Sequence, residues 1–85
     1  MTVKELIEAL NGENQDAIVI LSGDAEGNRY SPMADISIDG TYIKSSSWRG
    51  EVYPRHLTKR LIKQGYTEED VSKDGPECIV LWPVN

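Results

Sequence analysis

Two short, continuous apolar runs limit the folds that this chain can adopt. One covers residues 17–21, "AIVIL", and the other covers residues 78–82, "CIVLW". Runs of this length that are rich in β-branched residues are typical of strands covered on both faces. We therefore expect a central strand at 17–21 and a buried strand at 78–82, which Pro83 should end.

The first ten residues predict a helix. Thr2 and Glu5 have the spacing of a capping box, in which each side chain accepts a hydrogen bond from a free backbone N–H at the helix start. The apolar residues that follow recur at helical spacing and should form one face: Val3, Leu6, Ile7 and Leu10.

A second helix is predicted from His56 to a stop at Gly65. Its apolar side would carry Leu57, Leu61 and Ile62. Thr67 then precedes three acidic residues, which indicates the start of another short helical turn.

Between these helices, the segment "ADISIDGTYIKS" alternates apolar and polar residues around Asp39-Gly40. This dipeptide favours a two-residue hairpin, so strands near 34–38 and 41–45 should pair antiparallel. A second turn at Arg49-Gly50 would extend the sheet. The expected fold is a single α+β domain over residues 1–85, in which two helices pack on a small, mainly antiparallel sheet of three to five strands.

Charge is distributed unevenly along the chain, whose net charge is −5. Residues 1–40 carry two basic and eight acidic side chains, a net −6, and residues 67–85 carry one basic and five acidic, a net −4. Residues 41–66 carry six basic side chains and one acidic, a net +5. Because an acidic protein is repelled by phosphate, nucleic acid is not the favoured partner unless this basic segment gathers its charge locally.

The sequence lacks the patterns that common cofactors and metals require. The loop "DAEGNR" places Asp24, Glu26 and Asn28 at alternate positions, as a calcium loop does, but Arg29 stands where the sharp turn needs glycine. A single histidine, His56, excludes any zinc site that needs two imidazoles, and Cys78 has no Cys or His near it in the sequence, so a catalytic zinc is not expected. No phosphate-binding glycine run occurs. We expect no metal, no cofactor and no enzymatic activity.

The stretch "SSSWRGEVYPRH", residues 45–56, is the best candidate for a binding surface. Tryptophan, tyrosine and arginine are enriched among interface hot spots. In a regular strand, Trp48 and Tyr53 lie on opposite faces, so at least one of them should be exposed unless a bulge or loop intervenes. The candidate residues are Trp48, Arg49, Tyr53, Arg55, His56, Lys59 and Arg60. The alternative is that both aromatics pack inward and the basic helix face is merely solvated.

The segments "TVKELIEAL", "QDAIVILSGDAEGNRYSP", "GEVY" and "IVLWP" resemble a group of small phage and prophage proteins without an assigned chemistry. The resemblance implies an accessory phage protein in the bacterial cytoplasm that binds a host or phage protein. A nucleotide or nucleic-acid binder and an acidic mimic of nucleic acid stay open as alternatives. No apolar run is long enough to span a membrane, and exposed strand edges allow a homodimer without requiring one.

Overall fold

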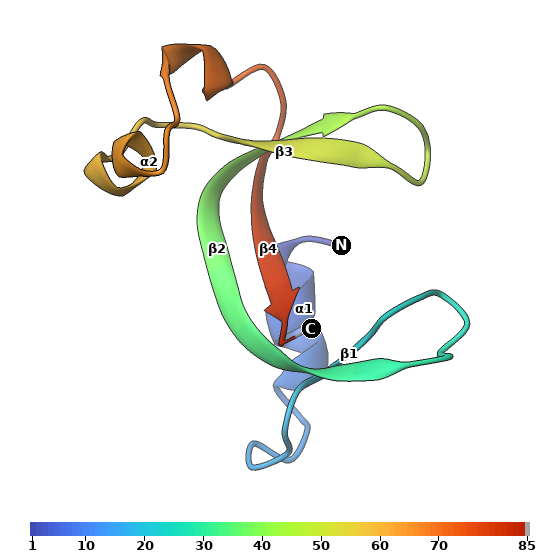
Figure 1. Cartoon of the computed structure of the whole chain (residues 1–85). Coiled ribbons are helices and arrows are strands. Elements are labelled where there is room, and N and C mark those ends of the chain that lie inside the picture. Colours follow the sequence, from blue (N-terminus) through green and yellow to red (C-terminus); the bar gives the residue numbers. More distant parts are fainter. Residues whose placement is uncertain (85) are drawn as a thin grey trace. The chain divides into compact units, whose positions relative to one another are not determined.

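The computed structural model describes residues 1–84 and has the predicted α+β composition, with two helices and four strands that all pair antiparallel (Figure 1). Two compact units share the chain, residues 1–32 and residues 33–84. The elements are α1 (Val3–Leu10), β1 (Ile20–Ser22), β2 (Tyr30–Lys44), β3 (Gly50–Pro54), α2 (Lys59–Lys63), the 3₁₀ turn η1 (Glu68–Asp70) and β4 (Glu77–Pro83).

Helix α1 begins where the capping box predicts. The backbone N–H of Glu5 donates to Thr2 Oγ1 at 3.1 Å, and the backbone N–H of Thr2 donates to Glu5 Oε1 at 3.0 Å. These bonds also lower the pKa of Glu5, chiefly through the backbone N–H of Thr2, because they favour the charged carboxylate.

The prediction of a central strand at 17–21 is wrong. Only Ile20–Ser22 forms a strand, β1, and it pairs with β2 alone, from Ile20 opposite Pro32 to Ser22 opposite Tyr30. Ile18 is 81% exposed, and its neighbour Val19 is also exposed. An apolar run is typical of a buried segment, but the run alone does not show whether other parts of the same chain bury it.

The hairpin predicted at Asp39-Gly40 is also wrong, because β2 continues through this dipeptide to Lys44. Asp39 does take the left-handed conformation typical of such a turn, with φ 63°. Here, however, it forms part of a bulge, where the register with β4 shifts between Ser37 opposite Val80 and Gly40 opposite Cys78. Figure 1 shows the resulting strong bend of β2.

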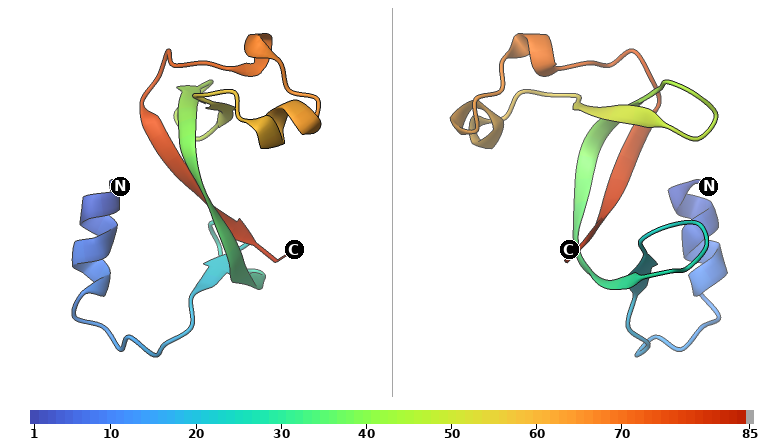
Figure 2. Two further views of the ribbon diagram at one scale, coloured as in Figure 1. Left: turned by 90° about the vertical axis from the view of Figure 1, so that its left-hand side faces the viewer. Right: turned by 45° about the vertical axis from the view of Figure 1, so that its right-hand side comes forward.

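Both edges of β2 are paired around Gly40 and Thr41. Gly40 lies opposite Pro54 of β3 and also opposite Cys78 of β4. Strand β4 ends at Pro83, as predicted, and runs beside β2 in both views of Figure 2. The real hairpin of this sheet joins β2 to β3 through residues 45–49.

The second helix is shorter than predicted. Thr58, not His56, caps it, with Oγ1 accepting the N–H of Leu61 at 3.2 Å. The predicted stop at Gly65 is confirmed, since Gly65 has φ 95°. The turn predicted after Thr67 is η1, where the Thr67 N–H donates to Asp70 Oδ2 at 2.7 Å.

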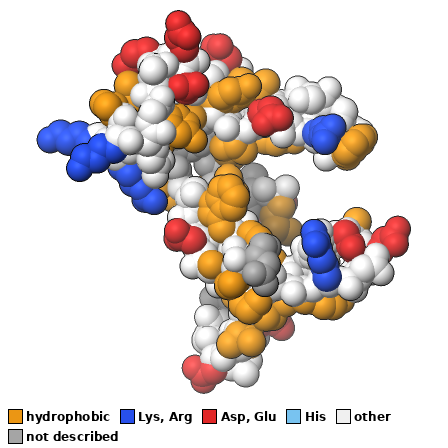
Figure 3. Space-filling view, in the orientation of Figure 1, with side chains coloured by type: hydrophobic (Ala, Val, Ile, Leu, Met, Phe, Trp, Pro, Cys, Tyr) orange, Lys and Arg blue, Asp and Glu red, His pale blue; other side chains and the backbone are white. Residues whose placement is uncertain are grey.

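Large apolar side chains remain accessible throughout the described chain. Among residues 1–84, no large apolar side chain is buried. The one fully buried side chain in this part of the chain is polar, that of Thr41. Figure 3 shows hydrophobic side chains at many points of the visible surface. The continuous apolar strand β4 therefore lacks the two-sided cover that its sequence predicts.

Gly75 is the glycine whose replacement should most directly disturb this sheet. A Cβ at this position would clash with the carbonyl oxygen of Tyr42, which is backbone and cannot rotate away. The Tyr42 N–H also bonds the carbonyl of Pro76 at 3.0 Å, which fixes the two segments. We expect Gly75→Ala to lower the free energy of unfolding by about 1–3 kcal/mol, measured by urea denaturation.

Gly12→Ala is the matched control. A Cβ at Gly12 meets nothing within 4 Å, so this change should be neutral or stabilise by up to about 1 kcal/mol. Equal unfolding midpoints for the two variants would contradict the tight approach of residue 75 to β2.

Candidate functional site

The turn between β2 and β3, residues 45–49, presents the most exposed aromatic side chain of the candidate stretch. We call it the tryptophan turn. Trp48 is 79% exposed, and the guanidinium carbon of Arg49 lies 5.5 Å from the centre of its ring. At this distance the cation and the aromatic face attract each other. Trp48 thus does not pack inward, and the turn offers a flat apolar ring together with a positive charge.

Backbone hydrogen bonds hold the tryptophan turn in one conformation. The N–H groups of Ser45 and Ser46 both donate to the Arg49 carbonyl, at 2.9 and 3.0 Å. The Trp48 N–H lies 3.4 Å from Ser46 Oγ, a weaker contact. An ordered turn loses less conformational entropy when it binds a partner than a mobile one does.

Tyr53 lies on β3 and is 37% exposed. The register places it opposite Thr41, whereas Val52 lies opposite Tyr42 on the other face of the sheet. The predicted alternation along 50–54 is therefore present. Trp48 and Arg49 lie outside the strand, in the turn, so the alternation does not extend to them.

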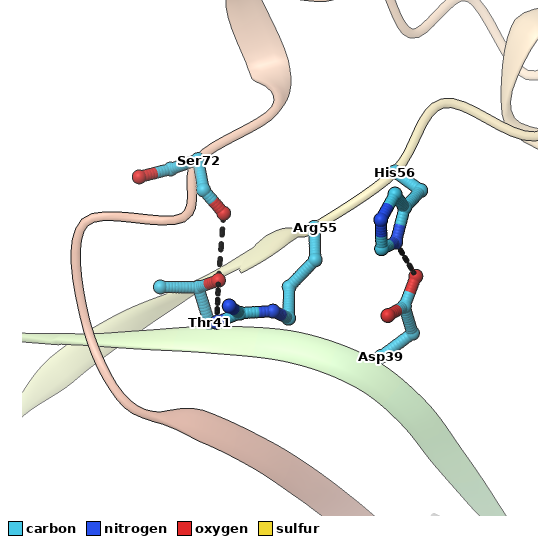
Figure 4. A network of polar contacts seen from close by, with 5 residues as sticks. All are labelled: Asp39, Thr41, Arg55, His56 and Ser72. Carbon is cyan, nitrogen blue, oxygen red and sulfur yellow. Dashed lines mark hydrogen bonds and ion pairs between the residues drawn. The ribbon is translucent and has the colours of Figure 1, made fainter.

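Arg55 is held by contacts within its own chain (Figure 4). Its Nη1 donates to Thr41 Oγ1 at 3.0 Å and to the Gly75 carbonyl at 3.3 Å. Thr41 Oγ1 in turn donates to the Ser72 carbonyl at 2.6 Å. Arg55 thus joins β2 to the segment that precedes β4, which gives it a structural role.

His56 also makes a contact within the chain. Its Nδ1 donates to Asp39 Oδ2 at 2.8 Å, and the backbone N–H of Arg55 donates to the Asp39 carbonyl at 3.0 Å. Together these bonds attach Arg55 and His56, which follow β3, to the bulge in β2 (Figure 4). Both side chains of this hydrogen bond stay partly exposed, so the contact contributes little to stability beyond positioning.

The candidate residues therefore fall into two groups. The tryptophan turn precedes β3, while Arg55, His56 and the cations of α2 follow it. Strand β3 separates the groups by about 16 Å, at about 3.3 Å per residue. Lys59 and Arg60 lie on α2 and are exposed. The residues predicted as one surface over 48–60 thus form two groups, one before and one after β3.

Sequence reasoning missed the roles of Thr41 and Asp39. Thr41 looked like one polar residue of an alternating strand, and Asp39 looked like a turn former. Their partners lie 14 to 31 positions away along the chain, so no local pattern could have indicated these bonds.

The acidic loop after β1 is organised by its own hydrogen bonds. Asp24 Oδ1 accepts the N–H of Glu26 at 2.9 Å and that of Asn28 at 3.1 Å. The hydrogen bond from Asn28 is the main reason that the pKa of Asp24 lies below its ordinary value. Within residues 1–84, no three His, Cys, Asp or Glu side chains gather as a metal site would require.

Comparisons with protein-family models, with curated proteins and with solved structures gave no match to this chain. Neither α1 nor α2, the helices of the described chain, has the length and apolar character needed to span a bilayer. The interpretation of the site therefore depends on the geometry above.

The Thr41 hydroxyl should contribute substantially to the free energy of unfolding. Thr41→Val keeps the shape but removes the hydrogen bonds to the Ser72 carbonyl and from Arg55 Nη1, so we expect a loss of about 1–3 kcal/mol in the free energy of unfolding. Thr41→Ser keeps the hydroxyl and should cost clearly less. Chemical denaturation of both variants tests this, and an equal loss would mean that the methyl group contributes as much as the hydroxyl, which would contradict the prediction.

The hydrogen bonds that organise the Asp24 loop should weaken at low pH. Hydrogen bonds to the charged carboxylate stabilise the loop above the ordinary pKa of aspartate, and this stabilisation is lost as pH falls through the lowered pKa. The amide NMR signals of Glu26 and Asn28 should therefore titrate with a midpoint below about 3.9. Asp24→Asn should remove this step, and a midpoint at or above the ordinary value would contradict the hydrogen-bonded carboxylate.

Proposed function

We propose that this chain is a non-catalytic accessory protein of a phage or prophage, acting in the bacterial cytoplasm, that binds a host or phage protein through the tryptophan turn. The observation that carries the proposal is the ordered exposure of Trp48 with Arg49 stacked on its ring. Tryptophan and arginine are two of the residues most enriched in interface hot spots, and a Trp48 side chain that is 79% exposed buries little area in its own chain.

The chemistry of the turn suits a partner with an apolar pocket bordered by acidic groups. The indole would fill the pocket, and Arg49 beside it can form a two-pronged hydrogen bond to a carboxylate. Glu51 is the one acidic residue of segment 41–66, so the local charge around the turn favours an acidic partner surface.

A nucleic-acid partner at the basic segment is less well supported. Two of the candidate residues have partners within the chain, since Arg55 bonds Thr41 and Gly75 while His56 bonds Asp39. The exposed cations of α2 remain: Lys59, Arg60 and Lys63. Three cations on one short helix give a small phosphate-binding surface, whose affinity would fall steeply with salt.

The test is quantitative affinity capture from bacterial lysate, followed by titration of the purified partner. Trp48→Ala should weaken binding by about 30-fold or more, as loss of a hot-spot residue does. The variant should keep the wild-type melting temperature, because the side chain is exposed. The matched variant Lys59→Ala, Arg60→Ala should bind the partner as tightly as wild type.

The opposite pattern would overturn the proposal. Retention by Trp48→Ala, together with salt-sensitive loss in the α2 variant, would indicate phosphate binding. Retention by both, with loss when the carboxylates of residues 1–40 are neutralised, would indicate an acidic mimic of nucleic acid.

A further inference from the structure

One carbonyl group closes the tryptophan turn. It is the carbonyl of Arg49, which accepts the N–H groups of Ser45 and Ser46 at 2.9 and 3.0 Å. This carbonyl belongs to the planar peptide group that joins Arg49 to Gly50, the first residue of β3. The direction of the carbonyl therefore depends on where the backbone of Gly50 is held.

The ring of Tyr42 lies against Gly50. The register places Tyr42 opposite Val52, two residues beyond Gly50 along β3. Tyr42 and Gly50 are thus diagonal neighbours across the hairpin, a distance that an aromatic side chain can span. A Cβ added to Gly50 would lie 2.6 Å from both Cζ and the hydroxyl oxygen of Tyr42. The ring occupies the space that a side chain at position 50 would fill, as aromatic residues do beside strand glycines.

The backbone of Tyr42 is fixed by contacts outside the tryptophan turn. Its N–H donates to the Pro76 carbonyl at 3.0 Å, and its carbonyl oxygen lies so close to Gly75 that a Cβ there has no room. The Tyr42 side chain is half-buried. Tyr42 therefore connects the segment before β4 to the first residue of β3. All of these contacts lie within the unit of residues 33–84.

We infer that Tyr42 is a positioning residue of the tryptophan turn, an inference that rests on the proposed function because it takes this turn as the binding site. The ring holds Gly50, whose backbone directs the Arg49 carbonyl, and this carbonyl orders the turn that presents Trp48. A turn that is ordered before it meets a partner loses less entropy on binding. Tyr42 thus raises the affinity for the partner through Gly50, without a contact of its own.

Amide hydrogen exchange of the whole chain, followed by NMR, tests this role without a partner. In Tyr42→Ala the amides of Ser45 and Ser46 should exchange at least about 10-fold faster than in wild type, because the turn opens more often. The Arg55 amide, which bonds the Asp39 carbonyl at the other end of the hairpin, is the internal reference and should change much less. Tyr42→Phe keeps the ring and should leave all three amides at their wild-type rates.

Two results of this experiment would overturn the inference. Unchanged exchange of Ser45 and Ser46 in Tyr42→Ala would show that the turn is ordered by its own bonds alone. An equal acceleration of the Arg55 amide would show that Tyr42 supports the whole sheet and not the turn in particular.

A double-mutant cycle tests the contact between the ring and Gly50. Gly50→Ala should lower the free energy of unfolding, because the added methyl group meets the Tyr42 ring and also lies 2.7 Å from the Ile43 carbonyl oxygen. The clash with Ile43 is present in both backgrounds and cancels in the cycle. The loss should therefore be smaller in a chain that already carries Tyr42→Ala, and an equal loss would contradict a ring packed on Gly50.

Gly50→Ala also provides a second route to the turn if Tyr42→Ala does not fold. The added methyl group displaces the ring, so the amides of Ser45 and Ser46 should again exchange faster relative to that of Arg55. Wild-type exchange of these amides in Gly50→Ala would overturn the inference.

The inference and the proposed function fail separately. Exchange measured without a partner tests the positioning by Tyr42, whereas partner binding by Trp48→Ala tests the proposed function. Where both hold, Tyr42→Ala should bind the captured partner about 10-fold more weakly than wild type, and Tyr42→Phe as tightly as wild type. Wild-type affinity in Tyr42→Ala would overturn the role of Tyr42 in binding.

Discussion

The hydroxyl of Thr41 is the contact around which the unit of residues 33–84 is organised. Its side chain is fully buried, at the position of β2 where β3 pairs on one edge and β4 on the other. The hydroxyl donates to the Ser72 carbonyl and accepts from Arg55 Nη1, so it uses both of its hydrogen-bonding roles. A polar group that is buried away from water must form hydrogen bonds within the protein instead. In this unit a hydrogen-bonded network occupies the place that an apolar core holds in most domains.

The bulge at Asp39 makes that arrangement possible. By shifting the register after Ser37, it lets β2 bend, and the same residue accepts bonds from the backbone of Arg55 and the ring of His56. The chain that leaves β3 is thereby fixed beside β2, which places the guanidinium of Arg55 at Thr41.

Features set by neighbouring residues could be predicted from the sequence. The Thr2 cap, the end of α2 at Gly65, the turn after Thr67 and the end of β4 at Pro83 all depend on contacts within a few positions. Asp39-Gly40 shows what a local sequence pattern cannot predict. The left-handed conformation was foreseeable, but whether it closes a hairpin or a bulge depends on β4, which begins 37 residues beyond Gly40. The sequence predicted that Trp48 or Tyr53 would be exposed because a strand alternates its faces, but Trp48 is exposed because it lies in the turn before β3. The hydrogen bonds of Arg55 and His56 to partners far along the chain could not be predicted from a local pattern.

The tryptophan turn depends on the sheet that presents it. It joins β2 to β3, whose register runs from Gly40 opposite Pro54 to Lys44 opposite Gly50, and the Arg49 carbonyl accepts the two backbone N–H groups at the start of the turn. A partner that buries Trp48 would therefore lose little affinity to ordering of the turn. Because a few hot-spot residues carry most of the binding energy of an interface, a small turn with one large aromatic anchor would suffice for specific binding.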